Sequence, residues 1–172
     1  MTVRPATMDD AAALAAVQVA TWQVAYRGQV PQEHLDRMDP ARREPGWRQW
    51  IRDARPPAGI LVLDDEEHGV IGFNCFAPTR DQDDDPATVG EVQAIYLLPS
   101  RWGTGGGRLL MAAGVRRLTE AGFRELTLWV LDTNAQARRF YEAAGWGPDG
   151  ASKVDDSRGF PMREVRYRRT LP

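Results

Sequence analysis

The sequence has 172 residues, of which 42% are hydrophobic and 27% charged, which is typical of one compact globular domain. Its formal net charge of -2 gives no basic field that would attract nucleic acid or an anionic membrane surface, so we expect neither partner. No apolar stretch reaches membrane-spanning length, and Asp9 and Asp10 stand where a secretory signal would carry positive charge. We therefore expect a cytoplasmic protein whose residues 1–172 form a single domain.

Residues that commonly bind metals are scarce. Cys75 is the only cysteine, and His34 and His68 are the only histidines. No internal disulfide can form, and no spacing among these residues resembles a metal site. We expect no metal, and we expect Cys75, in the middle of a predicted strand, to be an inert core residue.

The first third of the chain is predicted to be mainly helical. A short strand over residues 2–4 precedes a run of strong helix formers over 11–25. Pro31 suits the first turn of a short second helix. A third helix is predicted around Trp47 and ends before Pro56.

The period of the hydrophobic pattern then changes to that of strands. Residues 60–63 and 70–76 are predicted to form an antiparallel hairpin across an acidic turn. A polar loop over 78–86 leads to a strand over 89–98, which Pro99 ends.

Helices and strands alternate in the rest of the chain. A helix that ends at Gly122 follows a glycine-rich turn, and a strand over 126–131 comes next. Strand, helix and strand in this order predict a right-handed crossover between parallel neighbours. A helix over 134–144, a weaker strand after Gly145 and a final strand over 165–170 complete the pattern.

The glycine-rich turn over residues 99–110 reads Pro-Ser-Arg-Trp-Gly-Thr-Gly-Gly-Gly-Arg-Leu-Leu. Glycine lets the backbone approach a ligand closely, and the free amides of a helix amino terminus attract phosphate. The turn lacks a Walker lysine after Gly107, and Arg108 stands where a dinucleotide fingerprint requires glycine. Taken alone, it indicates either a pyrophosphate site or a flexible turn that binds nothing.

Two motifs together resemble the GNAT superfamily of N-acetyltransferases. Residues 95–99, Ile-Tyr-Leu-Leu-Pro, with the glycine-rich turn are similar to its coenzyme A-binding segment. Residues 134–146 are similar to its Asn-x-x-Ala-x-x-Phe-Tyr-x-x-x-Gly-aromatic stretch. The order and context of both agree with that family. The sequence departs from it at Trp102, where glutamine or arginine is usual, and at Gly106, where an aliphatic residue is common.

The resemblance implies an α+β (α/β-like) fold: a central mixed, mostly antiparallel twisted sheet of six to seven strands with helices on both faces. Its parallel pair splays at the coenzyme site. It implies transfer of an acetyl group from acetyl-CoA to a primary amine, by direct attack in a ternary complex. The acceptor is a small-molecule or peptide amine, and a homodimer is common for such a fold. The alternative is a non-catalytic acyl-CoA-binding sensor or docking module.

The resemblance also assigns coenzyme contacts to the strand end, to the glycine-rich turn and to the second motif. These residues are Ile95, Tyr96, Leu97, Gly103, Thr104, Gly105, Gly106, Gly107, Arg108, Asn134 and Tyr141. The backbone near Ile95 and Leu97 would pair with the pantetheine arm as an added strand. Asn134 also suits a helix cap.

Proton transfer needs a base and an acid. An amine with a pKa of about 10 is mostly protonated at neutral pH, and Glu91 matches the catalytic glutamate of some family members. The period of two predicts that Glu91, Gln93, Ile95 and Leu97 share one face of their strand. The alternative for Glu91 is a solvated or ion-paired carboxylate. Tyr141 matches the family's proton donor to the departing thiolate, and its alternative is a core tyrosine.

The residues expected around the acceptor say least about which amine is bound. By resemblance, Trp22 and Tyr26 form a wall of the acceptor pocket, although packing of their helix on the sheet explains them equally well. The acidic loop over 81–85 is predicted either to steer a cationic amine or to be a solvated tip.

Overall fold

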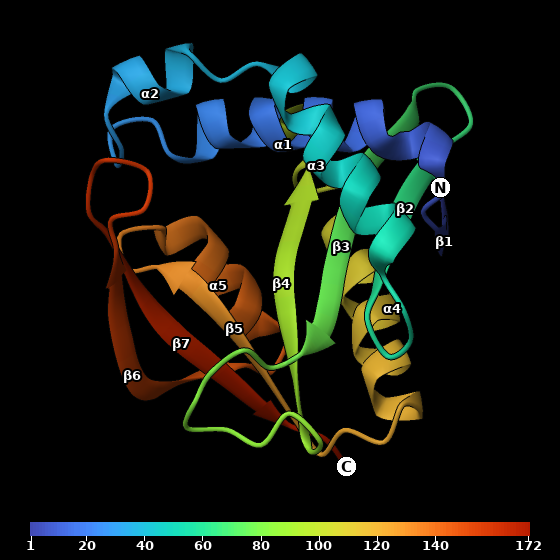
Figure 1. Ribbon diagram of the computed structural model, residues 1–172, viewed down its shortest axis with the longest axis vertical. Helices are drawn as coiled ribbons and strands as arrows, with labels where there is room; N and C mark the ends of the chain where they lie inside the picture. The colour runs from blue at the N-terminus through green and yellow to red at the C-terminus, as the bar shows by residue number, and fades with distance from the viewer.

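The computed structural model describes all 172 residues, and its seven strands form one sheet in the order β1-β2-β3-β4-β5-β7-β6 (Figure 1). The strands are β1 (Thr2–Pro5), β2 (Gly59–Asp65), β3 (Gly69–Pro78), β4 (Val89–Leu97), β5 (Glu125–Leu131), β6 (Gly147–Asp155) and β7 (Met162–Thr170). Only β4 and β5 are parallel neighbours. The predicted fold class, a mostly antiparallel sheet with one parallel pair, is confirmed.

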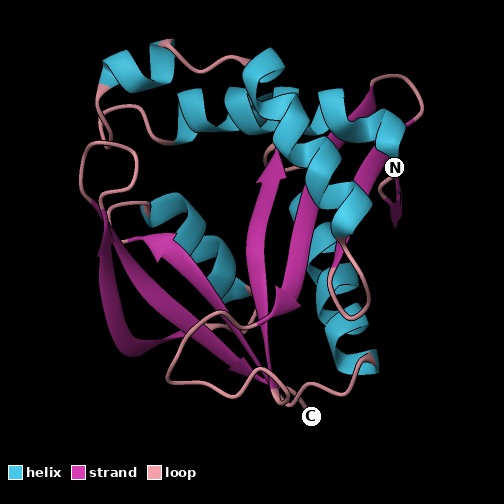
Figure 2. Cartoon of the chain, viewed as in Figure 1, coloured by secondary structure: helices cyan, strands magenta, loops and turns pink.

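Helices lie on both faces of this sheet (Figure 2). They are η1 (Met8–Asp10), α1 (Ala11–Ala25), α2 (Gln32–Asp36), α3 (Pro40–Asp53), η2 (Pro99–Arg101), α4 (Gly106–Glu120) and α5 (Ala135–Ala143). Leu14 of α1 packs with Phe73 of β3 on one face. Leu110 of α4 packs with Ile71 and Leu97 on the other. None of the helices combines the length and the apolar character needed to cross a lipid bilayer.

The pairing of β3 and β4 contains a bulge that changes which residues share a face. Cys75 pairs with Ala94, but the next residue on β3 pairs with Val92, so Gln93 is the extra residue. Val92 and Ile95 consequently both pack on the α4 side of the sheet. The prediction that Glu91 shares a face with Ile95 is wrong, because a bulge interrupts the alternation of side chains.

Two predictions about particular residues and strands are confirmed. The weak strand after Gly145 is β6, which pairs with β7 along the edge of the sheet. Cys75 is 1% exposed within the α1 side of the core. Burial raises the pKa of its thiol above the ordinary value, so Cys75 is a packing residue rather than a nucleophile.

Candidate active site

The parallel pair opens into a cavity. β4 and β5 pair only where Val89–Glu91 meets Glu125–Thr127, and beyond that point the strands separate (Figure 1). A cavity of about 300 Å³ lies there. It is lined by Thr21, Ala25, Tyr26, Val92, Gln93, Ala94, Ile95, Tyr96, Leu97, Trp102, Gly103, Gly105, Gly107, Arg108, Trp129, Val130, Asn134, Gln136, Ala137, Phe140 and Tyr141. Strand β4, the glycine-rich turn and α5 therefore converge on one space.

Most of the predicted site residues line this cavity, and four do not. Thr104, Gly106, Trp22 and Glu91 lie outside the lining. The hydroxyl of Thr104 donates to the carbonyl of Arg101, 2.7 Å away, and so closes the turn. Because its hydroxyl is used within the turn, only the backbone of Thr104 is left for the predicted coenzyme contact, and that contact stays a prediction.

The glycine-rich turn has a backbone that only glycine readily adopts. Gly103 and Gly105 have φ angles of 79° and 91°, in the left-handed region that costs other residues about 1–2 kcal/mol. Gly105 immediately precedes α4, and Leu109 donates to the Gly105 carbonyl as the helix begins. Amides in the first turn of a helix have no intrahelical acceptor, so they remain available for an anion.

At Gly106, glycine is explained by close packing and not by the backbone conformation. A Cβ at this position would lie 2.7 Å from Cδ2 of Leu63 and 3.4 Å from Cδ1 of Leu97. A side chain at residue 106 would therefore require the buried Leu63 side chain to shift. Glycine at this position fits the close packing of α4 against β2.

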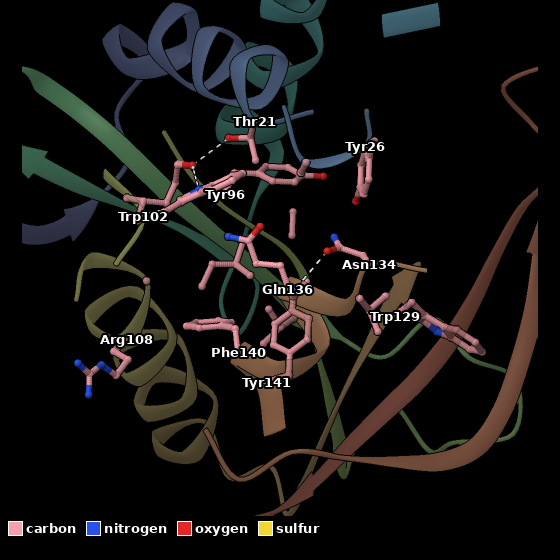
Figure 3. A pocket seen from close by; sticks show the side chains of 18 of the residues that line it. Thr21, Tyr26, Tyr96, Trp102, Arg108, Trp129, Asn134, Gln136, Phe140 and Tyr141 are labelled. Atoms are coloured by element: carbon pink, nitrogen blue, oxygen red, sulfur yellow. Dashed lines mark hydrogen bonds between the residues drawn. The ribbon is translucent and has the colours of Figure 1, made fainter. Parts of the chain in front are cut away.

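Trp102 fixes the end of β4. Its indole nitrogen donates to the carbonyl of Leu97 at 2.8 Å, and the hydroxyl of Thr21 donates to the same oxygen at 3.1 Å (Figure 3). This carbonyl points away from β3, and the main chain of Ile95, two residues earlier, points the same way. Sequence reasoning missed Thr21, because a threonine inside an alanine-rich helix gives no signal of its own.

Three tyrosines gather at the cavity. Tyr26, Tyr96 and Tyr141 come from α1, β4 and α5 (Figure 3). The hydroxyl of Tyr141 has no hydrogen-bond partner in the protein, whereas that of Tyr96 accepts from the indole of Trp22 at 3.1 Å. Burial raises the pKa of Tyr141, and the nearby Tyr96 adds to the effect. The phenol of Tyr141 therefore stays protonated and has its hydrogen free to donate.

Trp22 packs against two of the tyrosines that line the cavity and does not line it itself. It is 5% exposed, and its ring packs edge-on against Tyr26 with the centroids 4.7 Å apart. Together with its hydrogen bond to Tyr96, this geometry favours the packing interpretation of Trp22. Tyr26 itself does line the cavity.

Asn134 begins α5 and also lines the cavity. Its side-chain oxygen accepts from the amide of Ala137 at 3.1 Å, which is a helix cap. Its side-chain nitrogen has no partner in the protein. Both interpretations of Asn134 therefore fit one geometry: the oxygen caps the helix, and the nitrogen is left for a ligand.

Glu91 is held by an arginine. It is 2% exposed, and Nη2 of Arg80 lies 2.6 Å from its Oε1. Its Oε2 accepts from both the backbone amide and Nε of Arg80, each at 3.1 Å. This geometry favours the ion-paired alternative, and the catalytic role of Glu91 stays a prediction.

The acidic loop is folded onto β7. Arg166, which is 5% exposed, donates to Asp81, Asp83 and Asp84, and Arg168 also donates to Asp84. Asp81 and Asp84 are thereby held against β7, whereas Asp83 and Asp85 remain exposed. Steering of a cationic amine by this loop stays a prediction.

Comparisons with known proteins agree with this geometry. Residues 19–146 match the family model described as the acetyltransferase (GNAT) family. The chain is 34% identical over 166 residues, 96% of this chain and 90% of the other, to an uncharacterized N-acetyltransferase, YuaI, from Bacillus subtilis strain 168. It is 36% identical over 90 residues to the mycothiol acetyltransferase of Propionibacterium freudenreichii subsp. shermanii, a match that spans 52% of this chain and 28% of that protein.

The fold also recurs in solved structures. The chain resembles a crystal structure of PaiA N-acetyltransferase from Thermoplasma acidophilum in complex with coenzyme A, with a TM-score of 0.75. The match covers 99% of this chain and 98% of that one at 16% identity. This likeness shows a shared fold.

Proposed function

Because the chain belongs to the GNAT family of acetyltransferases, we propose that it transfers an acetyl group from acetyl-CoA to a primary amine by direct attack in a ternary complex. The observation that carries the proposal is the cavity between the splayed strands. It joins the exposed backbone of β4, the glycine-rich turn and the free hydroxyl of Tyr141 in one space.

The residues present fit acetyl-CoA, which supplies an activated thioester. The first amides of α4, after Gly105, are free for the diphosphate. The backbone of Ile95 points toward the gap between the strands, where the pantetheine arm can pair with β4 as an added strand. The carbonyl of Leu97 is already occupied by Trp102 and Thr21, so this pairing falls on Ile95 and on the amide of Leu97.

Tyr141 acts as the acid. Its phenol donates a proton to the sulfur as the carbon–sulfur bond breaks. The amine nitrogen forms the new bond to the acetyl carbon and releases its proton to water, and water returns a proton to the phenolate. The raised pKa of Tyr141 means that the phenol is protonated in the resting site. Glu91 does not take the proton of the amine directly, because both of its carboxylate oxygens are hydrogen-bonded to Arg80. It can accept this proton only through water.

The test is release of free thiol from acetyl-CoA with a panel of primary amines, beside thermal melting with acetyl-CoA. We expect acetyl-CoA to raise the melting temperature and at least one amine to release thiol. A thermal shift without thiol release across the whole panel would favour a non-catalytic coenzyme A-binding module. No thermal shift would refute both functions.

A further inference from the structure

One carboxylate beside the cavity is not used by this reaction. Glu164 of β7 lies directly opposite Leu131 of β5, and residues opposite one another share a face of the sheet at a Cβ separation of about 5 Å. Leu131 belongs to the buried cluster against which Tyr26 and Tyr96 pack, and both tyrosines line the cavity. Glu164 does not line the cavity itself, but it lies opposite a residue on which the tyrosines of the cavity pack.

Glu164 is also the least satisfied acid in this region. Asp155, on the neighbouring strand, and Glu91 each accept hydrogen bonds from an arginine. Glu164 accepts none, although its side chain is only 21% exposed. The nearest cation is Nζ of Lys153 at 3.9 Å, and that ammonium lies 4.0 Å from the ring centroid of Trp129.

The electrostatics of the region agree with this placement. Burial raises the pKa of Glu164, while Lys153, Arg158 and Arg80 act in the opposite direction. Burial also raises the pKa of Tyr26, and the charge of Glu164 adds to that effect. A carboxylate that is mostly buried and accepts no hydrogen bond is destabilising, and an ammonium group would supply the missing charge-assisted hydrogen bonds.

We propose that Glu164 binds a protonated nitrogen of the acceptor, so that the substrate class is a diamine or another amine with a second positive charge. The proposal rests on the acetyl-transfer function and names its acceptor. The charged nitrogen stays at Glu164, while the reacting amino group enters the cavity past Tyr26. The nearby cations do not favour an anionic acceptor, because Arg80 is bound by Glu91 and Arg158 by Asp155. The third, Lys153, lies opposite Glu164 itself and over the ring of Trp129.

The experiment measures acceptor binding without turnover. By calorimetry, 1,5-diaminopentane, 1-aminopentane and 6-aminohexanoate are titrated into the protein saturated with coenzyme A. We expect the diamine to bind at least about tenfold more tightly than the monoamine. Equal affinities, or tighter binding of the aminohexanoate, would overturn the proposal even before any variant is made.

Two variants locate the effect. Glu164→Gln keeps the shape of the side chain and removes its charge, and we expect the preference for the diamine to vanish. Glu33→Gln is the matched control, because it changes the net charge equally on the exposed side of α2, and it should keep the preference. A diamine preference that survives in Glu164→Gln would overturn the assignment.

This outcome is separable from the proposed function. If monoamines and diamines release thiol with equal kcat/KM, the acetyltransferase stands and the role of Glu164 is refuted. If no amine releases thiol, the acetyltransferase is refuted, and the calorimetric comparison still decides whether Glu164 binds an ammonium group.

Discussion

Replacing Tyr141 with phenylalanine should separate catalysis from stability. The hydroxyl lines the cavity and makes no hydrogen bond within the protein, so its removal leaves no partner group unsatisfied. Deleting such a buried hydroxyl is close to neutral for stability. General acid catalysis by a positioned side chain contributes about 10²- to 10⁴-fold, so we expect kcat to fall at least about 100-fold, which is about 2.7 kcal/mol of transition-state stabilisation.

The assay is thiol release from acetyl-CoA with the best amine, together with the affinity for acetyl-CoA by calorimetry. The affinity should change less than threefold, because the ring of Tyr141 and its contacts with Phe140 remain. An unchanged kcat would remove Tyr141 from the mechanism, and an equal loss of affinity would make it a binding residue.

Tyr167→Phe provides the matched control in the same aromatic cluster. The rings of Tyr141 and Tyr167 are 6.2 Å apart, but the Tyr167 hydroxyl donates to Glu142 at 2.7 Å and accepts from Arg138 at 2.9 Å. Glu142 is exposed and Arg138 is half-buried, so water can replace the hydroxyl. Its loss should lower the free energy of unfolding by about 0.5–1.5 kcal/mol with little effect on kcat. Similar behaviour of both variants would refute the distinction between them.

Three more predictions follow from the same geometry. Glu91→Gln removes one partner of an ion pair whose other member, Arg80, has a side chain that is 65% exposed. The free energy of unfolding, measured with denaturant, should fall by about 1–2 kcal/mol, and the pH–rate profile should not change. A turnover defect that is relieved at higher pH would make Glu91 the base. Gly106→Ala places a Cβ 2.7 Å from a leucine side chain of β2 and should cost about 1–3 kcal/mol of stability; an unchanged melting temperature would contradict this packing. Hydrogen bonds from Ser157 hold the pKa of Asp155 at about 2, below its value in the unfolded chain. The contribution of Asp155 to stability is therefore complete above the unfolded pKa and is lost as the pH falls toward 2. Asp155→Asn should abolish that part of the acid dependence of the melting temperature, and identical acid curves for both proteins would contradict this.

Local signals in the sequence were enough for the fold and for most of the residues that line the cavity. The glycine-rich turn, the strand before it and the Asn134 motif each combine residue types with narrow conformational demands. Gly103 and Gly105 adopt the positive φ angles that explain their presence. Hydrophobic periodicity similarly placed the strands and helices, because both faces of this sheet are covered.

The acceptor side depends on contacts that no local pattern encodes. The bulge at Gln93 turns Glu91 away from Ile95, and it shows only in the register of β3 and β4. Arg80 and Glu91 are 11 residues apart and meet because the loop between β3 and β4 folds back. Glu164 becomes notable only when its lack of hydrogen-bond partners can be seen in three dimensions.

The most direct test is a crystal structure with acetyl-CoA bound. We expect the diphosphate on the amides that follow Gly105, the pantetheine arm beside Ile95, and the sulfur within hydrogen-bonding reach of the Tyr141 hydroxyl. Acetyl-CoA bound outside the gap between β4 and β5, or with its sulfur remote from Tyr141, would refute the proposed function of this cavity.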